Sequence, residues 1–337
     1  MPCPNLCGYS YISQQGCHVS LRQDCAVVKQ GTTVLQEAQL PMLEQILVFG
    51  QSQLTTQLIR ACLWRSIPIA YLSRMGRCYG RVLPVTSGYR SLARQQYGLS
   101  EATRLTIAKQ LVRAKLKNCR VILQRQQRRQ DQAAVAGAIA QLAQLAQQAE
   151  QAATTEQLMG YEGAGAASYF GVFGTCIDNP AFVWTGRSKR PPSDPLNAML
   201  SFGYQVLWNH LLSLIELQGL DPYVACLHQG SERHPALASD LIEVFRAPIV
   251  DSLVLYLVNR QMINAVDDFA FPPDGGCYLN ESGRKKLLRA LLGRMEERVQ
   301  GVNGASMPRW DVLNQQVKQF RLFITQVSPV YEPYQIR

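Results

Sequence analysis

The pattern of apolar and polar residues changes character about a third of the way along the chain. Up to about Pro84, short alternating or apolar runs rich in β-branched residues are separated by turn residues, as in CHVSLRQD, CAVVKQGTTVLQEAQL and LEQILVFG. Such runs predict β-strands. The stretch LTTQLIRACLWRSIPIAYLS predicts a helix followed by a strand, with the break at Pro68. We therefore expect a small, β-rich, sandwich-like domain over residues 1–95.

From Ser100 onward the apolar residues recur at helical spacing. Ser100 is a suitable N-cap, and the apolar positions that follow it are Leu105, Ala108, Val112, Cys119 and Ile122. Residues 130–152 are rich in Ala and Gln, which favours a helix packed on a neighbour. The sequence thus predicts an α+β protein whose larger, all-helical domain covers residues 96–337.

Other helix boundaries in this domain can be placed from capping residues. Asp194 before Pro195 predicts a cap and a first helical position, and Gly219 predicts the end of the same helix. Three more helical patterns follow, over 235–262, 281–300 and 306–326.

The composition is that of a folded, basic protein. Apolar residues make up 47% of the chain, and 34 basic against 24 acidic residues give a net charge of +10. We find no run of eighteen uncharged apolar residues and no leader-like N-terminus, so we expect no membrane span and a cytoplasmic location. The ten cysteines are scattered and form no CxxC pair, which favours reduced thiols.

The positive charge is concentrated in one predicted helix. Between Arg94 and Arg129 there are ten Lys or Arg residues and one acid, Glu101. Four of the basic residues, Lys109, Arg113, Lys117 and Arg120, fall on one stripe. A charge stripe is usually a solvated face, but such a face normally mixes both signs, and this one favours a polyanionic partner.

A candidate for metal chemistry lies in HQGSERHPALASDLIEVFR, residues 228–246. Asp240 and Glu243 are three residues apart on one predicted helix face, and His228 precedes them in a polar loop. Alone, such acids are usually solvated and such a histidine is usually structural. Together they are the donors that a hard or borderline divalent cation requires.

A further carboxylate, Glu162, lies in YEGAGAASYF, followed by five small residues. Small side chains allow another helix to approach closely, so this carboxylate could meet a partner from elsewhere in the chain. The alternative is a packing interface with a glutamate in the first helical turn. Spacing alone does not join position 162 to positions 228 and 243.

Several of these segments, taken in order, resemble the motifs of one family. YEGAGAASYF, DPLNAMLSFGY, GLDPYVACLH and ALASDLIEVFRAPIVDSLVLYLVNR are similar to motifs of the CRISPR-associated spacer-acquisition integrases, the near-universal enzymes of CRISPR adaptation. The segment LEQILVFGQSQLTTQLIRACLWRSIPIAYLSRMGRCYGRV resembles the small β domain of that family. The resemblance covers essentially the whole chain.

The resemblance implies a site that binds Mg²⁺ or Mn²⁺. Its ligands would be Glu162, His228 and Glu243, and Asp240 matches an acid that supports them. The implied reaction inserts short DNA fragments into a CRISPR array: a 3′-hydroxyl attacks a phosphodiester at the edge of a repeat. His234 stands where the family often has a basic residue, and we expect it to contact phosphate or solvent rather than the metal.

The resemblance also implies partners for a prokaryotic antiviral defence protein. These are double-stranded DNA (the captured fragment and the repeat), a second copy bound through the β domain, and the small companion protein of the adaptation complex. Candidate phosphate contacts are Arg113, Lys117, Arg120, Arg187, Lys189, Arg190 and Arg246. For Arg246, the alternative is a salt bridge to Asp240 or Glu243.

Two other functions use the same residues. A metal-dependent nuclease for branched or single-stranded nucleic acid could use this site without joining DNA. A catalytically silent DNA-binding scaffold is disfavoured because Glu162, His228 and Glu243 are all present.

Overall fold

The computed structural model describes residues 8–12, 14–73, 78–85, 89–128, 133–228, 234–273, 275–301 and 304–336. The chain divides into two compact units, Met1–Gly88 and Tyr89–Arg337. The division falls before the expected boundary at residue 95 because Tyr89–Tyr97 form a helix, α2. The Gln96 side chain of α2 donates hydrogen bonds to two carbonyls of the second unit, which ties this helix to that unit.

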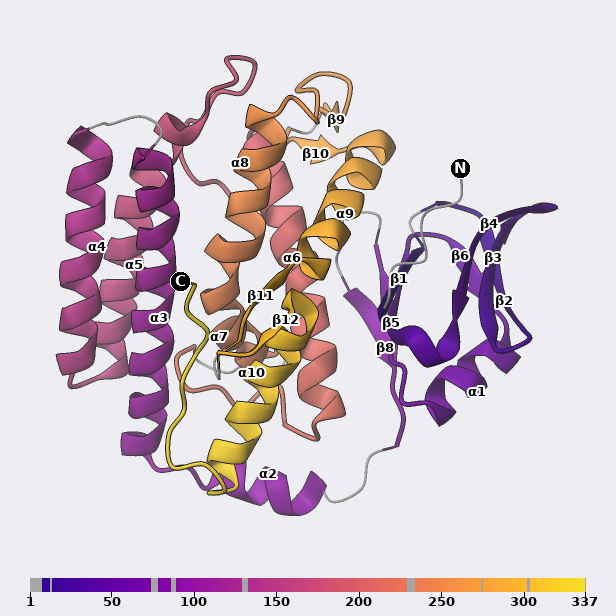
Figure 1. Ribbon diagram of the computed structural model, residues 1–337, viewed down its shortest axis with the longest axis horizontal. Coiled ribbons are helices and arrows are strands. Elements are labelled where there is room, and N and C mark those ends of the chain that lie inside the picture. Colours follow the sequence, from indigo (N-terminus) through magenta and orange to yellow (C-terminus); the bar gives the residue numbers. More distant parts are fainter. Residues whose placement is uncertain are drawn as a thin grey trace. The chain divides into compact units, whose positions relative to one another are not determined.

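The first unit contains two four-stranded sheets (Figure 1). In one sheet β1 (Gly8–Ile12), β5 (Leu43–Phe49) and β7 (Ile69–Leu72) are parallel, and β8 (Cys78–Val82) is antiparallel to β7. The other has the order β4 (Thr33–Gln39), β3 (Cys25–Gln30), β2 (Cys17–Arg22), β6 (Ser52–Leu54). A short 3₁₀ turn, Leu40–Met42, leads from β4 into β5.

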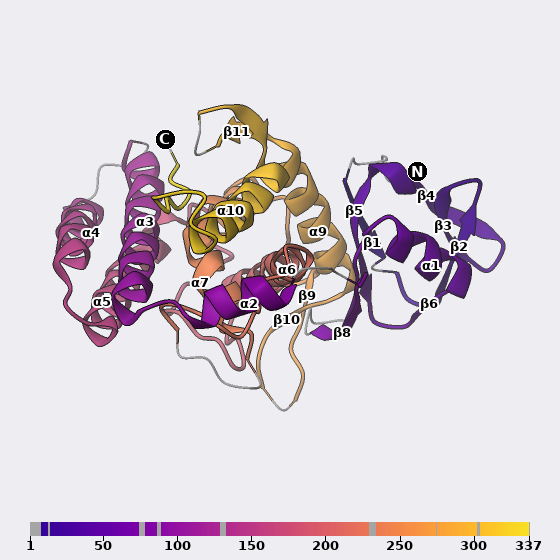
Figure 2. The ribbon, with the colours of Figure 1, turned by 90° about the horizontal axis from the view of Figure 1, so that it is seen from below.

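The core of this unit lies between the two sheets. Alternate residues such as Ile46 and Val48 on β5 and Val19 on β2 are fully buried in one apolar cluster. Helix α1 (Thr56–Trp64) adds Leu58 and Cys62 to it and closes one open end of the sandwich (Figures 1 and 2). The expected β-rich sandwich and the helix–strand order around Pro68 are confirmed.

The second unit is mostly helical. Its helices are α2, α3 (Glu101–Gln127), α4 (Ala133–Gln151), α5 (Thr155–Gly171), the 3₁₀ turn η2 (Phe173–Cys176), α6 (Pro195–Leu217), α7 (Ala236–Phe245), the π-helical turn η3 (Arg246–Asp251), α8 (Ser252–Asn259), α9 (Glu281–Glu296) and α10 (Arg309–Ile324). Two small hairpins pair β9 (Phe269–Ala270) with β10 (Tyr278–Leu279) and β11 (Arg298–Gln300) with β12 (Ser306–Pro308). None of the helices in the described part of the chain is long and apolar enough to span a membrane.

The capping residues act as the sequence predicts. The Ser100 side chain accepts a hydrogen bond from the Thr103 N–H, and the Asp194 side chain accepts one from the Asn197 N–H at 2.9 Å. Gly219 follows α6 with a positive φ of 74°, a conformation that glycine adopts without steric cost. The described cysteines are all free thiols.

Three of the expected helices differ from the structure. The predicted helix over 235–262 is divided by η3, because Pro248 has no N–H to continue the regular hydrogen bonds, and its last part ends at Asn259. The helices expected over 281–300 and 306–326 are shorter, because residues 298–300 and 306–308 pair as a hairpin instead. The second unit is therefore not purely helical.

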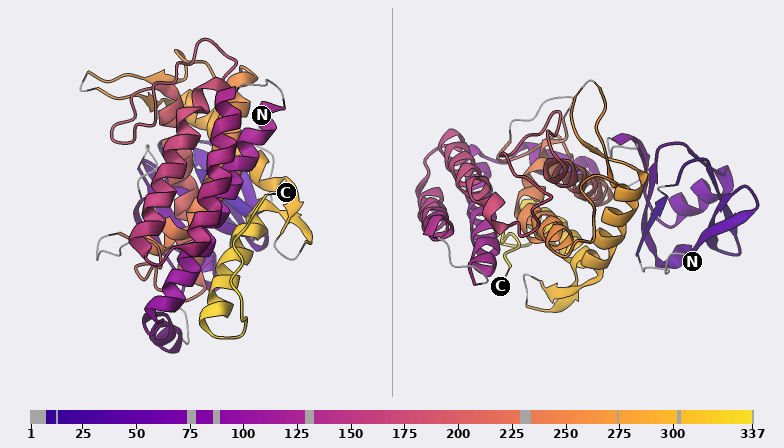
Figure 3. Two further views of the ribbon diagram at one scale, coloured as in Figure 1. Left: turned by 90° about the vertical axis from the view of Figure 1, so that its left-hand side faces the viewer. Right: turned by 90° about the horizontal axis from the view of Figure 1, so that it is seen from above.

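Helices α3, α4 and α5 pack against one another, each touching both of the others (Figures 1, 2 and 3). Helix α7 and η3 pack against both α3 and α6 in the interior of the unit. Gly165 makes the close approach of α5 possible, because a Cβ at this position would collide with the Leu116 side chain of α3. Within the small-residue run, Gly165 therefore serves helix packing, and Glu162, three residues earlier on α5, lies close to α3.

Replacing Asp194 by alanine should lower the free energy of unfolding of the helical unit by about 1 kcal/mol, because the first turn of α6 loses its cap. Urea titration followed by far-UV circular dichroism measures this. Asp194→Ser is the matched control, since serine is also a good cap. An alanine variant as stable as the serine variant would contradict the capping role.

Candidate functional site

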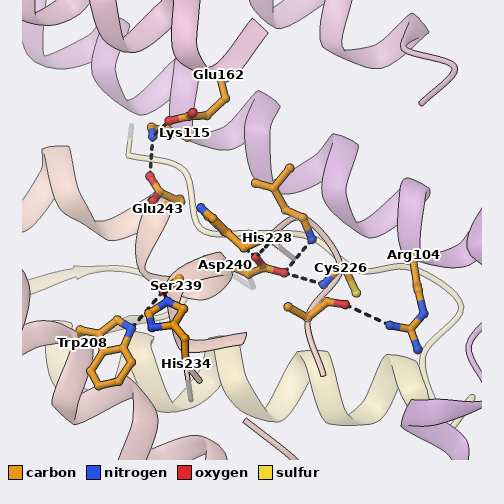
Figure 4. Close-up of polar contacts among 12 residues, drawn as sticks. Arg104, Lys115, Glu162, Trp208, Cys226, His228, His234, Ser239, Asp240 and Glu243 are labelled. Atoms are coloured by element: carbon orange, nitrogen blue, oxygen red, sulfur yellow. Dashed lines mark hydrogen bonds and ion pairs between the residues drawn. The ribbon is translucent and has the colours of Figure 1, made fainter. Parts of the chain in front are cut away.

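Helix α7 is buried on every side, including its two acids. Asp240 is 0% and Glu243 6% exposed. Acids at this spacing are usually solvated, but these two lie inside the apolar core. Buried carboxylates are stable only when they are paired or hydrogen-bonded, so their partners define the site shown in Figure 4.

Asp240 binds the backbone of the loop that carries His228. Its Oδ2 accepts hydrogen bonds from the N–H groups of Cys226 (2.6 Å) and Leu227 (2.9 Å). Its Oδ1 accepts from the His228 N–H (2.9 Å) and lies 2.8 Å from the ring Nδ1 of His228. This carboxylate therefore fixes both the loop and the imidazole, and its own oxygens are fully used.

These contacts determine the state of the His228 ring. An ionised carboxylate only accepts hydrogen bonds, so Nδ1 carries a hydrogen and Nε2 holds the free lone pair of the neutral ring. Burial alone would lower the pKa of His228, but the hydrogen bond and charge of Asp240 outweigh it and raise that pKa. A carboxylate on the far nitrogen is the usual support of a metal-binding histidine.

Glu162 and Glu243 share one cation, the Lys115 ammonium of α3 (Figure 4). Lys115 Nζ lies 2.5 Å from Glu243 Oε2 and also pairs with Glu162 Oε1. The three side chains come from α3, α5 and α7, so this ionic contact joins three helices.

The balance of charges keeps Glu243 ionised despite its burial. Burial raises the pKa of Glu243, but the positive charges of Arg246 and Lys115 outweigh burial and lower this pKa to about 2. Arg246 Nε donates to Glu243 Oε1 at 3.1 Å, so the salt-bridge alternative for Arg246 is the one found here. The carboxylates also raise the pKa of Lys115, although burial opposes this.

The donor set fits a divalent cation. Two carboxylates already hold one cation between them, and His228 lies between Asp240 and Glu243, close enough for Glu243 and the imidazole to influence each other's pKa (Figure 4). As placed, no three His, Cys, Asp or Glu side chains among the described residues converge into a metal cage. Lys115 supplies the positive charge at that position, so a metal held by both carboxylates requires its ammonium to move away.

A second group of cations lies beside these carboxylates. The Arg246 guanidinium lies 4.6 Å from the centre of the Tyr204 ring, and Arg187 lies 5.5 Å from it. Arg187 also donates to the Asn197 side chain at 2.7 Å, so the basic loop is held against α6. Partial desolvation and the charges of Arg246 and Arg187 lower the pKa of the neighbouring Lys189, and Arg190 is exposed at the end of this loop.

The basic stripe of α3 is not a free surface. Arg113 pairs with Glu150 of α4, and Arg113, Lys117 and Arg120 are half-buried. Burial and the Arg113 charge lower the pKa of Lys117. The structure therefore gives Arg113 a partner within the protein.

His234 is exposed and contacts neither acid. Its Nε2 lies 2.8 Å from the Ser239 Oγ, which also accepts a hydrogen bond from the Trp208 indole N–H at 3.2 Å. The His234 and Trp208 rings are nearly parallel, with centres 6.0 Å apart. The intervening residues 229–233 lie outside the described residues.

Lys115 is the residue of the candidate site that sequence reasoning missed. It is one of ten basic residues between 94 and 129, and the charge-stripe pattern selected its neighbours instead. The available signal was its place on the apolar side of α3, beside Leu111, Val112 and Cys119, where a lysine needs a partner.

The model of one family, described as CRISPR associated protein Cas1, matches residues 10–292. Over 298 residues the chain is 33% identical to the CRISPR-associated endonuclease Cas1 1 of Chlorobaculum tepidum, covering 86% of this chain and 87% of that protein. It is 35% identical over 300 residues to a Cas4/Cas1 fusion of Geobacter sulfurreducens. That match covers 86% of this chain and spans about half (53%) of the fusion.

Solved structures share the fold. A Cas1 protein from Thermotoga maritima superposes with a TM-score of 0.78 at 23% identity, covering 94% of this chain and 97% of that one. A casposase bound to integration product gives 0.82 at 22%, covering 96% and 92%. A Cas6-RT-Cas1–Cas2 complex gives 0.80 at 22%, covering 99% of this chain and 37% of that one.

Fold and site thus define a two-unit protein with buried acids and an imidazole in its helical unit. The chain belongs to the Cas1 family.

Replacing Asp240 by asparagine should weaken Mn²⁺ binding by roughly 10- to 100-fold, because the amide cannot accept from all the groups that orient His228. Electron paramagnetic resonance of free Mn²⁺ measures the affinity without any reaction. Ser239→Ala, the adjacent position on α7, is the control and should bind Mn²⁺ like the parent. Equal affinity in all three proteins would show that Asp240 does not support the site.

Proposed function

We propose that this chain is a metal-dependent integrase of CRISPR adaptation, which joins short DNA fragments into the repeat array. The observation that carries this proposal is the meeting of Glu162 and Glu243 on one cation beside a carboxylate-oriented His228. Support comes from the family, whose curated relatives are named endonucleases, and from the fold shared with a casposase bound to integration product.

Glu162, Glu243 and Nε2 of His228 would hold Mg²⁺ or Mn²⁺. The metal, when bound, supplies a Lewis acid that polarises the scissile phosphate and stabilises the charge of the attacking or leaving oxygen. Asp240 acts as a positioning residue: its oxygens are occupied by the loop and the ring, so it is not free to take a proton from the nucleophile.

In the strand-transfer step, the 3′-oxygen of the short DNA forms a bond to phosphorus as the bond to the 3′-oxygen of the neighbouring repeat-side nucleotide breaks. The attacking hydroxyl loses its proton to solvent, and the leaving oxygen gains one. Arg246 is held by Glu243 and Tyr204 beside the proposed metal ligands, where it would compensate charge on the phosphate. Hydrolysis differs only in using water as the nucleophile, which is how a nuclease would use the same site.

The exposed cations of the loop are the best candidates for backbone contacts to DNA. Lys189 and Arg190 are exposed, and His234 holds its ring at a fixed position near Arg190. These groups would bind phosphates and position the strand without reading sequence. Arg113, with its Glu150 partner, is the weakest of the predicted contacts.

The proposed partners are double-stranded DNA, a second copy of the chain bound through the β-rich unit, and the small companion protein. The neighbouring Cas1–Cas2 and Cas1–DNA structures support the companion and DNA proposals.

A strand-transfer assay tests the proposed function. The chain, with and without its companion, is incubated with a short duplex bearing 3′-hydroxyl ends and a repeat-containing plasmid, in Mg²⁺, Mn²⁺ or EDTA. We expect joined products that EDTA abolishes. Glu243→Gln and His228→Ala should lower the joining rate by more than about 10²-fold, as expected for loss of transition-state charge stabilisation.

Glu156→Gln is the matched control, because Glu156 is an exposed acid on the same helix as Glu162. It should join DNA at the parent rate. Metal-dependent cutting without joined products would favour the nuclease alternative, and joining that survives both active-site substitutions would mean that the site is wrongly placed.

A further inference from the structure

The carbonyl next to Glu243 lacks its usual helical partner. In a regular helix the Val244 carbonyl would accept from the N–H of residue 248, but Pro248 has none. The side chain of Asn118 on α3 supplies the donor instead: its Nδ2 lies 2.7 Å from the Val244 oxygen. A side chain of another helix thus completes the backbone of α7 at the site.

Asn118 holds a third part of the chain at the same time. Its Nδ2 also donates to the Tyr334 carbonyl at 3.0 Å, and its Oδ1 accepts from the Ile336 N–H at 3.0 Å. The side chain is buried, 1% exposed. All these bonds are therefore made in the interior, where a missing partner costs most.

The segment 331–336 is itself well fixed. The Tyr334 ring stacks on Phe245 of α7, with centres 5.5 Å apart and an interplanar angle of 17°. Gln316 of α10 accepts from the Tyr334 N–H at 2.7 Å and donates to the Tyr331 hydroxyl at 2.8 Å. This segment therefore covers the end of α7 and gives Asn118 a rigid surface to bind.

Two contacts between α3 and α7 lie one helical turn apart. Lys115 pairs with Glu243, and Asn118 binds the carbonyl of the next residue, Val244. A metal at Glu243 would replace the ionic contact, because both cations need the same carboxylate. The amide contact of Asn118 involves no carboxylate and can persist through that exchange.

We propose that Asn118 is a positioning residue that keeps Glu243 aligned with Glu162 and His228 when the cation on these carboxylates changes. Asn118 touches neither DNA nor metal and acts through the backbone of α7 and the segment 331–336. This inference rests on the proposed metal-dependent function. The position of Glu243 relative to Glu162 and His228 then depends on the hydrogen bond from Asn118 to Val244, which is uncharged and does not change with metal binding or pH.

The test compares Asn118→Ala with Gln316→Ala. Both remove buried hydrogen bonds to the segment 331–336, but the hydrogen bonds of Gln316 go to Tyr331 and Tyr334 rather than to α7. Both variants should melt at lower temperature. Asn118→Ala alone should bind Mn²⁺ about tenfold more weakly and show a similar loss in kcat for joining, with an unchanged Kd for DNA.

Asn118→Leu is the second variant, in case the alanine protein does not fold. It keeps the approximate size of the side chain without adding charge and loses the donor to Val244, so it should show the same weakened Mn²⁺ binding. Equal Mn²⁺ affinity in the parent and in folded Asn118 variants would overturn the proposal, as would an equal loss in Gln316→Ala. If the parent itself bound no Mn²⁺, the proposed function would fail instead. Electron paramagnetic resonance of free Mn²⁺ distinguishes a parent that does not bind from variants that bind as well as the parent.

Discussion

The helical unit is organised around charges that cannot be left alone in an apolar interior. Glu243 is buried on α7, and two cations neutralise it, Lys115 and Arg246. Removing one member of such a group leaves a buried charge without a partner, which costs several kcal/mol. The positions of α3, α5 and α7 follow from this constraint, since each contributes one charge to the Glu162–Lys115–Glu243 contact.

Uncharged features of the fold make this meeting possible. Gly165 lets α5 approach α3, and Gly203 lets α6 approach η3, where a Cβ would lie 2.6 Å from Val250. Pro248 interrupts the helix after Glu243, and π-helical turns of this kind are often found at functional sites. Here the turn places Arg246 over Tyr204, whose hydroxyl binds the buried Asp251, so the arginine is held at the same site.

Much of the fold could be predicted from the sequence, because it depends on local signals. The alternation of apolar and polar residues predicted the strands, and the capping residues Ser100 and Asp194 predicted two helix starts. The motifs that resemble the family indicated Glu162, His228 and Glu243. Lys115 could not be singled out, because its importance comes from burial against two other helices. For the same reason the pairing of Arg113 with Glu150 of α4 could not be predicted, because spacing along one helix does not reveal a contact with another.

The most direct test of the metal site is a crystal structure of the protein with Mn²⁺, located by its anomalous scattering. We expect one Mn²⁺ bound by Glu162, Glu243 and Nε2 of His228, with His228 Nδ1 still on Asp240 and the Lys115 ammonium moved away from its place between the carboxylates. A Mn²⁺ ion bound elsewhere, with Lys115 still between Glu162 and Glu243 in protein that joins DNA under the same conditions, would contradict the assignment of these residues as the metal site.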